Sequence, residues 1–214
     1  MFDDPAARGI IALQGGGPFV ANDALDRRLI DAAGAESVVV LPTADAFEHP
    51  AVLIAAAMAW GERLGVHVEA LMVLSRPDAL DAGSAAVVRG AKAVYLAGDS
   101  PMHLRSVVKD TPLFDALRQV VVDGGVVAAV GQSANALCDP MTDPRGGAFT
   151  LGLGLVTGVA LVTEVEGWSH DRLARTVKLA AGKDALASLA TGTALLRTGG
   201  GWELVGDVDI HGEL

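Results

Sequence analysis

The stretch Val126-Val127-Ala128-Ala129-Val130-Gly131-Gln132-Ser133-Ala134-Asn135 decides the fold. Five apolar residues in a row are typical of a strand that is buried on both faces of a parallel sheet. The glycine that follows ends the strand, and the small residues after it allow a helix to begin at once. The stretch therefore predicts a strand–turn–helix elbow that holds Ser133 at the turn and exposes its hydroxyl at the top of the sheet.

The segments around this elbow repeat the alternation of strands and helices. Because alternating strands and helices indicate parallel crossovers, we predict one α/β domain over residues 1–214, with a doubly wound, mostly parallel sheet and helices on both faces. A helix after Ser169 and a hairpin from Ala194 to Val208 are expected near the C-terminus. The other predicted strands span 9–14, 37–41, 66–74 and 93–97, and the other predicted helices span 22–33, 50–64, 82–89 and 111–123.

Composition and charge exclude several classes of protein. The formal net charge of −10 argues against binding to nucleic acid or to an anionic membrane surface. The single cysteine, Cys138, excludes an intrachain disulfide and a thiolate metal site. The sequence shows neither a signal-peptide pattern nor a run of 18 apolar residues. We expect a cytoplasmic protein with no metal, no cofactor, no nucleic-acid partner and no membrane partner; monomer and homodimer are both open.

Four polar or glycine-rich segments follow the predicted strands: Gly15–Gly17, Pro42–Asp45, Gly98–Ser100 and Gly131–Asn135. In open parallel sheets, ligands bind beyond the carboxyl ends of the strands, so we expect these segments to line one site. The residues expected to contact a substrate there are Gly16, Gly17, Thr43, Ser100 and Asn135.

The elbow itself predicts acyl-transfer chemistry. A serine on such a turn can attack a carbonyl carbon while the next backbone amide donates to the oxyanion. The second glycine of the usual elbow pattern is replaced here by Asn135. The alternative is that Ser133 only caps the helix that follows it.

A series of motifs resembles the aspartyl dipeptidase and cyanophycinase family of serine peptidases, and this resemblance implies a flavodoxin-like core of the class I glutamine amidotransferase-like kind. The motifs are the Gly15–Gly17 turn, Leu41-Pro42-Thr43-Ala44, Tyr95-Leu96-Ala97-Gly98-Asp99-Ser100, Gly131-Gln132-Ser133-Ala134-Asn135-Ala136 and Gly152-Leu153-Gly154-Leu155-Val156. This resemblance implies a hydrolase that cleaves a small peptide or amide next to an aspartyl residue, with Ser133 as nucleophile. It also implies an oxyanion hole made by the amides of Gly98 or Asp99 and of Ala134.

The family histidine is missing from its expected position, which Glu164 occupies. A serine hydroxyl is a poor nucleophile without a base within hydrogen-bond distance. His170 is one candidate base, because the dipole at a helix N-terminus keeps its imidazole neutral. Glu164 or Glu166 is the other candidate, although a carboxylate deprotonates a hydroxyl poorly.

Two more residues after the elbow are candidates for the site. Asp143 lies in the loop where the dipeptidase branch of the family places the acid that orients its histidine, although Asp-Pro pairs such as Asp143-Pro144 also favour plain turns. Arg145 could bind a substrate carboxylate through two parallel hydrogen bonds.

Three functions remain open from the sequence. The first is a serine hydrolase. The second is a catalytically inactive or repurposed family member whose cleft binds a small acidic ligand or a partner, which would account for Asp99, Asn135 and Glu164. The third is a nucleotide-binding protein, which the strand and Gly15–Gly17 turn suggest but the missing Gly-x-Gly-x-x-Gly spacing disfavours.

Overall fold

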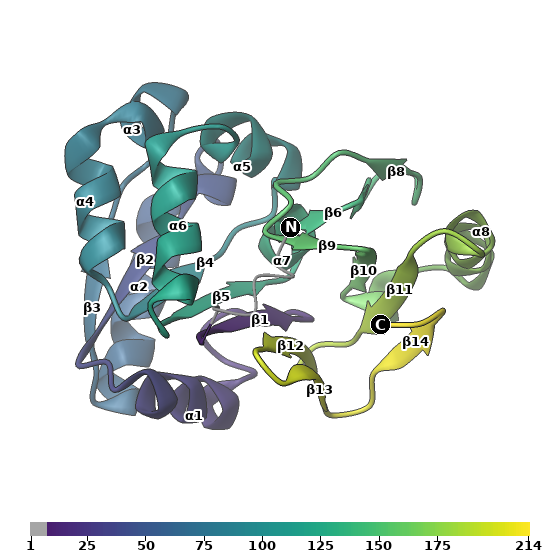
Figure 1. The fold of residues 1–214 in the computed structure, drawn as a ribbon, viewed down its shortest axis with the longest axis horizontal. Helices are drawn as coiled ribbons and strands as arrows, with labels where there is room; N and C mark the ends of the chain where they lie inside the picture. The colour runs from purple at the N-terminus through teal and green to yellow at the C-terminus, as the bar shows by residue number, and fades with distance from the viewer. Residues whose placement is uncertain (1–7) are drawn as a thin grey trace.

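A seven-stranded sheet forms the centre of the structure, a computed structural model that describes residues 8–214 (Figure 1). Its strands lie in the order β13-β12-β1-β5-β4-β2-β3. The five strands from β1 to β3 in this order are parallel, and β12 and β13 pair antiparallel. The strands are β1 (Ile10–Gln14), β2 (Ser37–Leu41), β3 (His67–Ala70), β4 (Ala93–Leu96), β5 (Val126–Val130), β12 (Ala194–Thr198) and β13 (Gly201–Val205).

This topology confirms the predicted doubly wound, mostly parallel α/β fold. The order β3-β2-β4-β5 matches the first four places of a flavodoxin-like sheet, and β1 takes the fifth place. Strands β12 and β13 form the predicted C-terminal hairpin, and β12 pairs with the free side of β1. The sheet edge next to β1 is therefore closed by residues from the far end of the chain.

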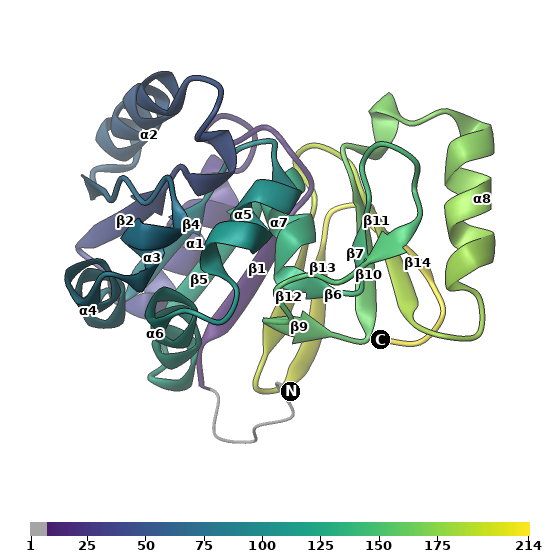
Figure 2. The same cartoon turned by 90° about the horizontal axis from the view of Figure 1, so that it is seen from above.

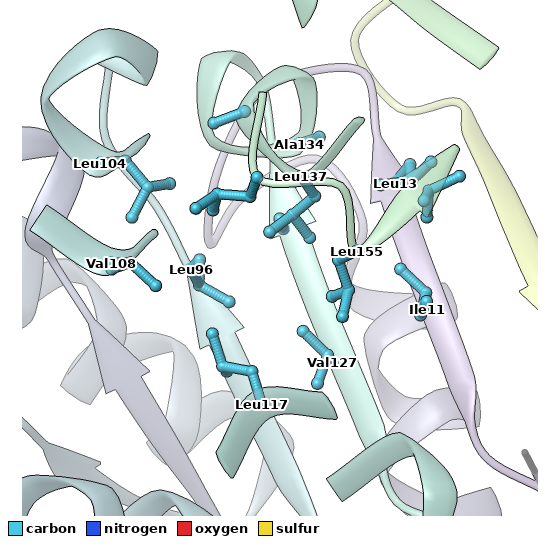
Figure 3. Packing of buried hydrophobic residues seen from close by; sticks show 14 of the residues in the cluster. Ile11, Leu13, Leu96, Leu104, Val108, Leu117, Val127, Ala134, Leu137 and Leu155 are labelled. Atoms are coloured by element: carbon cyan, nitrogen blue, oxygen red, sulfur yellow. The ribbon is translucent and has the colours of Figure 1, made fainter. Parts of the chain in front are cut away.

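Helices cover both faces of the sheet (Figure 2). Successive side chains of a strand point to opposite faces, so Ala12 packs towards one group of helices and Leu13 towards the other. Helices α1 and α2 cover the Ala12 face, and α3 to α7 cover the Leu13 face, where Leu96 and Val127 of the sheet meet Leu117 of α6 (Figure 3). The helices are α1 (Asp23–Ala33), α2 (Pro50–Leu64), α3 (Arg76–Leu80), α4 (Ala82–Gly90), α5 (Pro101–Val108), α6 (Pro112–Val122), α7 (Gln132–Leu137) and α8 (His170–Ala180).

The helix ends follow the expected capping chemistry. Thr111 caps α6, because its side chain accepts a hydrogen bond from the amide of Phe114. Gly65 ends α2 in the left-handed conformation, with φ 61°. The predicted strand 66–74 is shorter than expected, and helix α3 follows it, capped by Ser75 and Asp78.

A second sheet lies beside the first and was not predicted. Its order is β10-β11-β14, with β10 (Val159–Thr163) parallel to β11 (Ala185–Leu189) and β14 (Asp209–His211) at its other edge. One face of β10 and β11 joins the core on the Leu13 side of the main sheet, and α8 packs on the other face (Figure 2). Two short pairs complete the structure, β6 (Cys138–Asp139) with β9 (Val156–Thr157), and β7 (Met141–Thr142) with β8 (Phe149–Thr150).

One carboxyl group is buried between the main sheet and helices α1 and α2. Asp26 is only 2% exposed, and it accepts hydrogen bonds from Gln14 Nε2 at 2.6 Å and from Trp60 Nε1 at 3.1 Å. Tyr95 donates in turn to Gln14 Oε1 at 3.1 Å. Burial raises the pKa of Asp26 to about 7, although both of its hydrogen bonds oppose this rise.

None of the helices within residues 8–214 combines the length and the apolar character that crossing a lipid bilayer requires. Over the same residues, the His, Cys, Asp and Glu side chains form no group of three or more that could hold a metal ion.

Candidate functional site

The carboxyl ends of β1, β2, β4 and β5 bring the four predicted loop segments together. The amide of Gly131 donates to the carbonyl of Gln14 at 2.9 Å, which ties the elbow to the end of β1. The amide of Ser100 donates to the carbonyl of Ala44 at 2.9 Å, which joins the loops after β2 and β4. The candidate site therefore lies at this edge of the main sheet, as expected for an open parallel sheet.

The sharp turn of the elbow falls on Gly131. This residue has φ 59° and ψ −129°, the conformation of the first central residue of a type II′ turn, which glycine adopts far more readily than any residue with a Cβ. Helix α7 begins at the next residue, Gln132. Ser133 is thus the second residue of the helix and not the residue of the turn.

Ser133 does not present an exposed hydroxyl, and this part of the sequence analysis is wrong. The residue is 0% exposed, and its Oγ donates to the carbonyl of Gly98 at 3.0 Å. The physical reason is that the chain turns at Gly131, so that Ser133, already inside the first turn of α7, lies in the packing between α7 and the loop after β4. Its hydroxyl satisfies a buried backbone carbonyl there.

The backbone amides expected in the oxyanion hole have other orientations. The amide of Ala134 donates to the carbonyl of Gly131 at 3.1 Å. Because the carbonyl of Gly98 points at Ser133, the amide of Asp99 in the same trans peptide points the opposite way. The structure therefore does not aim the amides of Asp99 and Ala134 at an oxyanion formed on Ser133.

Glu164 faces the elbow. It follows β10 in the left-handed conformation, with φ 51° and ψ 45°, and its amide donates to the carbonyl of Gly15 at 3.0 Å. A Cβ placed on Gly131 would lie 4.0 Å from Glu164 Cδ, and a Cβ placed on Gly16 would lie 2.7 Å from Glu164 Cγ. Burial raises the pKa of Glu164, and the nearby charges of Asp99 and Glu166 raise it further.

The structure does not bring His170 to the elbow. Ser169 caps α8 as predicted, by accepting from the amide of Arg172, and this places His170 at the first position of that helix. The His170 side chain is 95% exposed, and its charged neighbour is Asp171, at 3.9 Å between Nδ1 and Oδ1. Helix α8 lies on the far side of the second sheet from α7 (Figure 2).

Asp143 and Arg145 pair with each other. Arg145 Nε donates to Asp143 Oδ1 at 3.0 Å and Arg145 Nη2 donates to Asp143 Oδ2 at 2.9 Å. This pairing lowers the pKa of the Asp143 carboxyl. The Arg145 side chain is 78% exposed, so the pair is a surface turn, which was the alternative considered from the sequence.

Two residues predicted to contact substrate instead hold backbone in place. Thr43 is fully buried, and its hydroxyl donates to the carbonyl of Val73 at 2.7 Å. Asn135 is 2% exposed; its Nδ2 donates to the carbonyl of Thr142 at 2.6 Å and its Oδ1 accepts from the amide of Thr142 at 3.0 Å. Gly16, Gly17 and Ser100 remain in the loops at the sheet edge, with Ser100 in the cap position of α5.

An open cleft of about 300 Å³ lies beside these loops. Partial burial raises the pKa of Asp99 in its wall, and the charges of Asp45 and Glu48 raise it further. Apolar side chains of α2 also line the cleft, so its lining combines carboxylates with apolar groups. Its lining residues are Pro18, Phe19, Asp45, His49, Val52, Leu53, Ala56, Gly98 and Asp99.

Sequence reasoning missed two features of this site. The sequence analysis places Asp45 in a loop of the site but does not single it out as a carboxylate that lines the cleft. It treats Gly131 as the residue that ends the strand and not as the turn residue of the elbow. A signal for the second was present, because Gly131 is the only glycine between strand β5 and helix α7. Only that position can take the turn conformation without strain.

Comparisons with known proteins agree with this fold. A peptidase from an acI-B1 Actinobacterium superposes with a TM-score of 0.85 at 24% identity, over 97% of this chain and 92% of the other. A candidate Peptidase E protein from Listeria monocytogenes EGD-e superposes with a TM-score of 0.67 at 15% identity, over 95% of this chain and 98% of the other. No protein-family model and no curated protein sequence matches the chain. At these identities the likeness shows a shared fold, in agreement with the resemblance to the aspartyl dipeptidase type.

Proposed function

We propose that this chain is a binding protein with a peptidase fold, whose cleft holds a small ligand with an ammonium group without forming a covalent bond to serine. The amino end of a peptide is a ligand of this class. The observation that carries the proposal is the complete burial of Ser133, whose hydroxyl is used by the carbonyl of Gly98. A buried hydroxyl that donates to a backbone carbonyl, and not to a base, is not an activated nucleophile.

The lining of the cleft supports the class of ligand. Asp45 and Asp99 both line the cleft, and the charges of Asp45 and Glu48 act on Asp99. A bound ammonium group would relieve the repulsion between these carboxylates, whereas an acidic ligand, which the sequence left open, would increase it. The apolar side chains of Val52 and Leu53 suit an aliphatic group attached to the amine.

Titration with leucinamide tests this proposal. Leucinamide carries an ammonium group and an aliphatic side chain but no carboxylate, and N-acetylleucinamide is its uncharged control. We expect calorimetry to detect binding of the first compound only, and binding should weaken by about tenfold in Asp99→Asn, the loss of about 1.4 kcal/mol expected for a charged hydrogen bond. Asp31→Asn is the matched control, because Asp31 lies on the exposed face of α1 and pairs loosely with Arg27. Equal binding of both compounds, or of neither, would contradict the proposal.

Hydrolysis of a small peptide or amide through Ser133 is the second candidate. It is favoured by the fold shared with proteins described as peptidases, and it requires the Ser133 hydroxyl to leave the Gly98 carbonyl and to meet a base. Incubation with a fluorophosphonate followed by intact-mass analysis separates the two candidates. Labelling that disappears in Ser133→Ala would favour the hydrolase, and we expect no labelling of folded wild-type protein.

A further inference from the structure

We infer that Gly131, and not Ser133, is the elbow position that faces a bound ligand, and that Glu164 binds the ligand's ammonium group in the open space above Gly131. This inference rests on the proposed function for the class of ligand. The assignment of Gly131 as the turn residue of the elbow rests on the backbone geometry alone.

The backbone places position 131 at the edge of the sheet. In a strand–turn–helix elbow, the side chain that points out of the sheet belongs to the residue with the strained turn conformation. That residue is Gly131, with φ 59° and ψ −129°, directly after Val130 of β5. The position from which a nucleophile would act therefore carries no side chain in this protein.

The space over Gly131 is open. When Gly131 and its two neighbours in the sequence are left out, the only atom of residues 8–214 within 4 Å of a Cβ built on Gly131 is Glu164 Cδ, at 4.0 Å. The absent side chain therefore leaves a gap that is bordered by a carboxylate. A small group placed over Gly131 therefore fits without displacing protein atoms, although the backbone of Gly131 is itself buried.

Glu164 is held in position towards this gap. Its left-handed backbone conformation, φ 51°, is uncommon for a residue with a side chain, and such residues persist where the surroundings fix them. Its side-chain stem packs against the backbone of Gly16, and its amide is bonded to Gly15. On the other side, Gln132 Nε2 donates to Thr163 Oγ1 at 3.2 Å, which ties the start of α7 to the end of β10.

The carboxylates beside this gap favour a positively charged group of the ligand. The charges that act on Glu164 are those of Asp99 and Glu166, and both are negative. A donor with a positive charge satisfies the carboxylate and reduces this repulsion, and a charge-assisted hydrogen bond is about twice as strong as a neutral one. The same gap would repel a carboxylate or phosphate.

A pair of cysteine substitutions tests the assignment of the elbow. In Gly131→Cys the thiol should lie in the space beside Glu164, where a small reagent can reach it, and in Ser133→Cys it should be enclosed by protein. Cys138, the single natural cysteine, is fully buried, and burial raises the pKa of its thiol, so it gives little background. We expect iodoacetamide to alkylate Gly131→Cys at least about tenfold faster than Ser133→Cys, measured by intact mass. Faster alkylation of Ser133→Cys would overturn the assignment.

A second measurement tests the role of Glu164, and its affinity readout does not depend on a substitution at the strained glycine. Glu164→Gln keeps the shape of the side chain and removes its charge. We expect its affinity for leucinamide to fall by about tenfold, and leucinamide to slow the alkylation of Gly131→Cys. His170→Ala is the control, because that side chain is almost fully exposed on α8. Unchanged affinity in Glu164→Gln would overturn the role of Glu164. If wild-type protein binds no leucinamide, the proposed function fails and the ammonium role of Glu164 fails with it, while the alkylation rates still decide the elbow.

Discussion

Asp26 should make the stability of the protein fall as the pH rises towards neutrality. Its pKa is about 7 in the folded protein, against 3.8 for an unperturbed aspartate. Between these values the folded protein keeps a proton that the unfolded chain releases, so the free energy of unfolding falls by about 1.4 kcal/mol per pH unit. The full difference of about three units corresponds to about 4 kcal/mol, which is present below about pH 4 and lost by about pH 7.

The substitution Asp26→Asn isolates this effect. Asparagine keeps the size of the side chain, and its Oδ1 can accept from Trp60 while its Nδ2 donates to Gln14 after rotation of the glutamine amide. The variant should therefore gain stability relative to wild type as the pH rises from about 5 to about 7, by about 2–3 kcal/mol. The gain should level off above about pH 7, where Asp26 is ionised in both states.

Urea unfolding followed by tryptophan fluorescence measures the difference, because Trp60 packs directly against Asp26. Tyr95→Phe is the matched control: it removes the hydroxyl that donates to Gln14 but keeps the carboxyl, so its pH profile should run parallel to wild type. A constant stability difference between Asp26→Asn and wild type over this pH range would refute the reasoning.

Three further substitutions test other contacts. Asn135→Ala removes both hydrogen bonds to the backbone of Thr142 and should lower the free energy of unfolding by about 2–3 kcal/mol in urea titrations; a loss below about 0.5 kcal/mol would show that water replaces the amide. Thr111→Ala removes the cap of α6 and should cost about 1 kcal/mol in the same assay, whereas Thr111→Ser should cost little. Gly98→Ala should lower the melting temperature by several degrees, because φ is 119° and a Cβ there would lie 2.6 Å from the amide nitrogen of Asp45; a wild-type melting temperature would contradict this.

The main sheet could be predicted from the sequence because its strands and helices are set by local patterns. The apolar runs at Ser37–Leu41 and Val126–Val130 became strands with the predicted bounds, and Gly65 and Thr111 ended and began helices as expected. The second sheet could not be predicted in the same way. Strand β10 forms through pairing with β11, more than 20 residues later, and the short apolar run 159–163 does not specify that partner.

The sequence predicts which loops meet at the candidate site, but it does not predict how their side chains are arranged. The loops were placed correctly, because the carboxyl ends of parallel strands meet at one edge. Which residue of Gly131-Gln132-Ser133 forms the turn depends on where pairing with β1 stops, at Val130 opposite Gln14. A shift of two residues moved the serine from the expected cleft into the packing around Gly98. Asn135 likewise holds the backbone of Thr142 by hydrogen bonding. Its place at the second glycine of the usual elbow pattern does not suggest this role.

The pairing of β1 has a consequence for how the chain is made. Residues 10–14 are synthesised before both of their neighbours in the sheet, which are Val126–Val130 and, on the other side, Ala194–Thr198. During elongation, β1 is an apolar strand with both edges unpaired until the ribosome has added more than 110 residues, and with one edge unpaired until the hairpin emerges. Nascent chains of this protein should therefore depend on chaperones until both partners of β1 have emerged, and chains that terminate before residue 194 should aggregate through the free edge of β1.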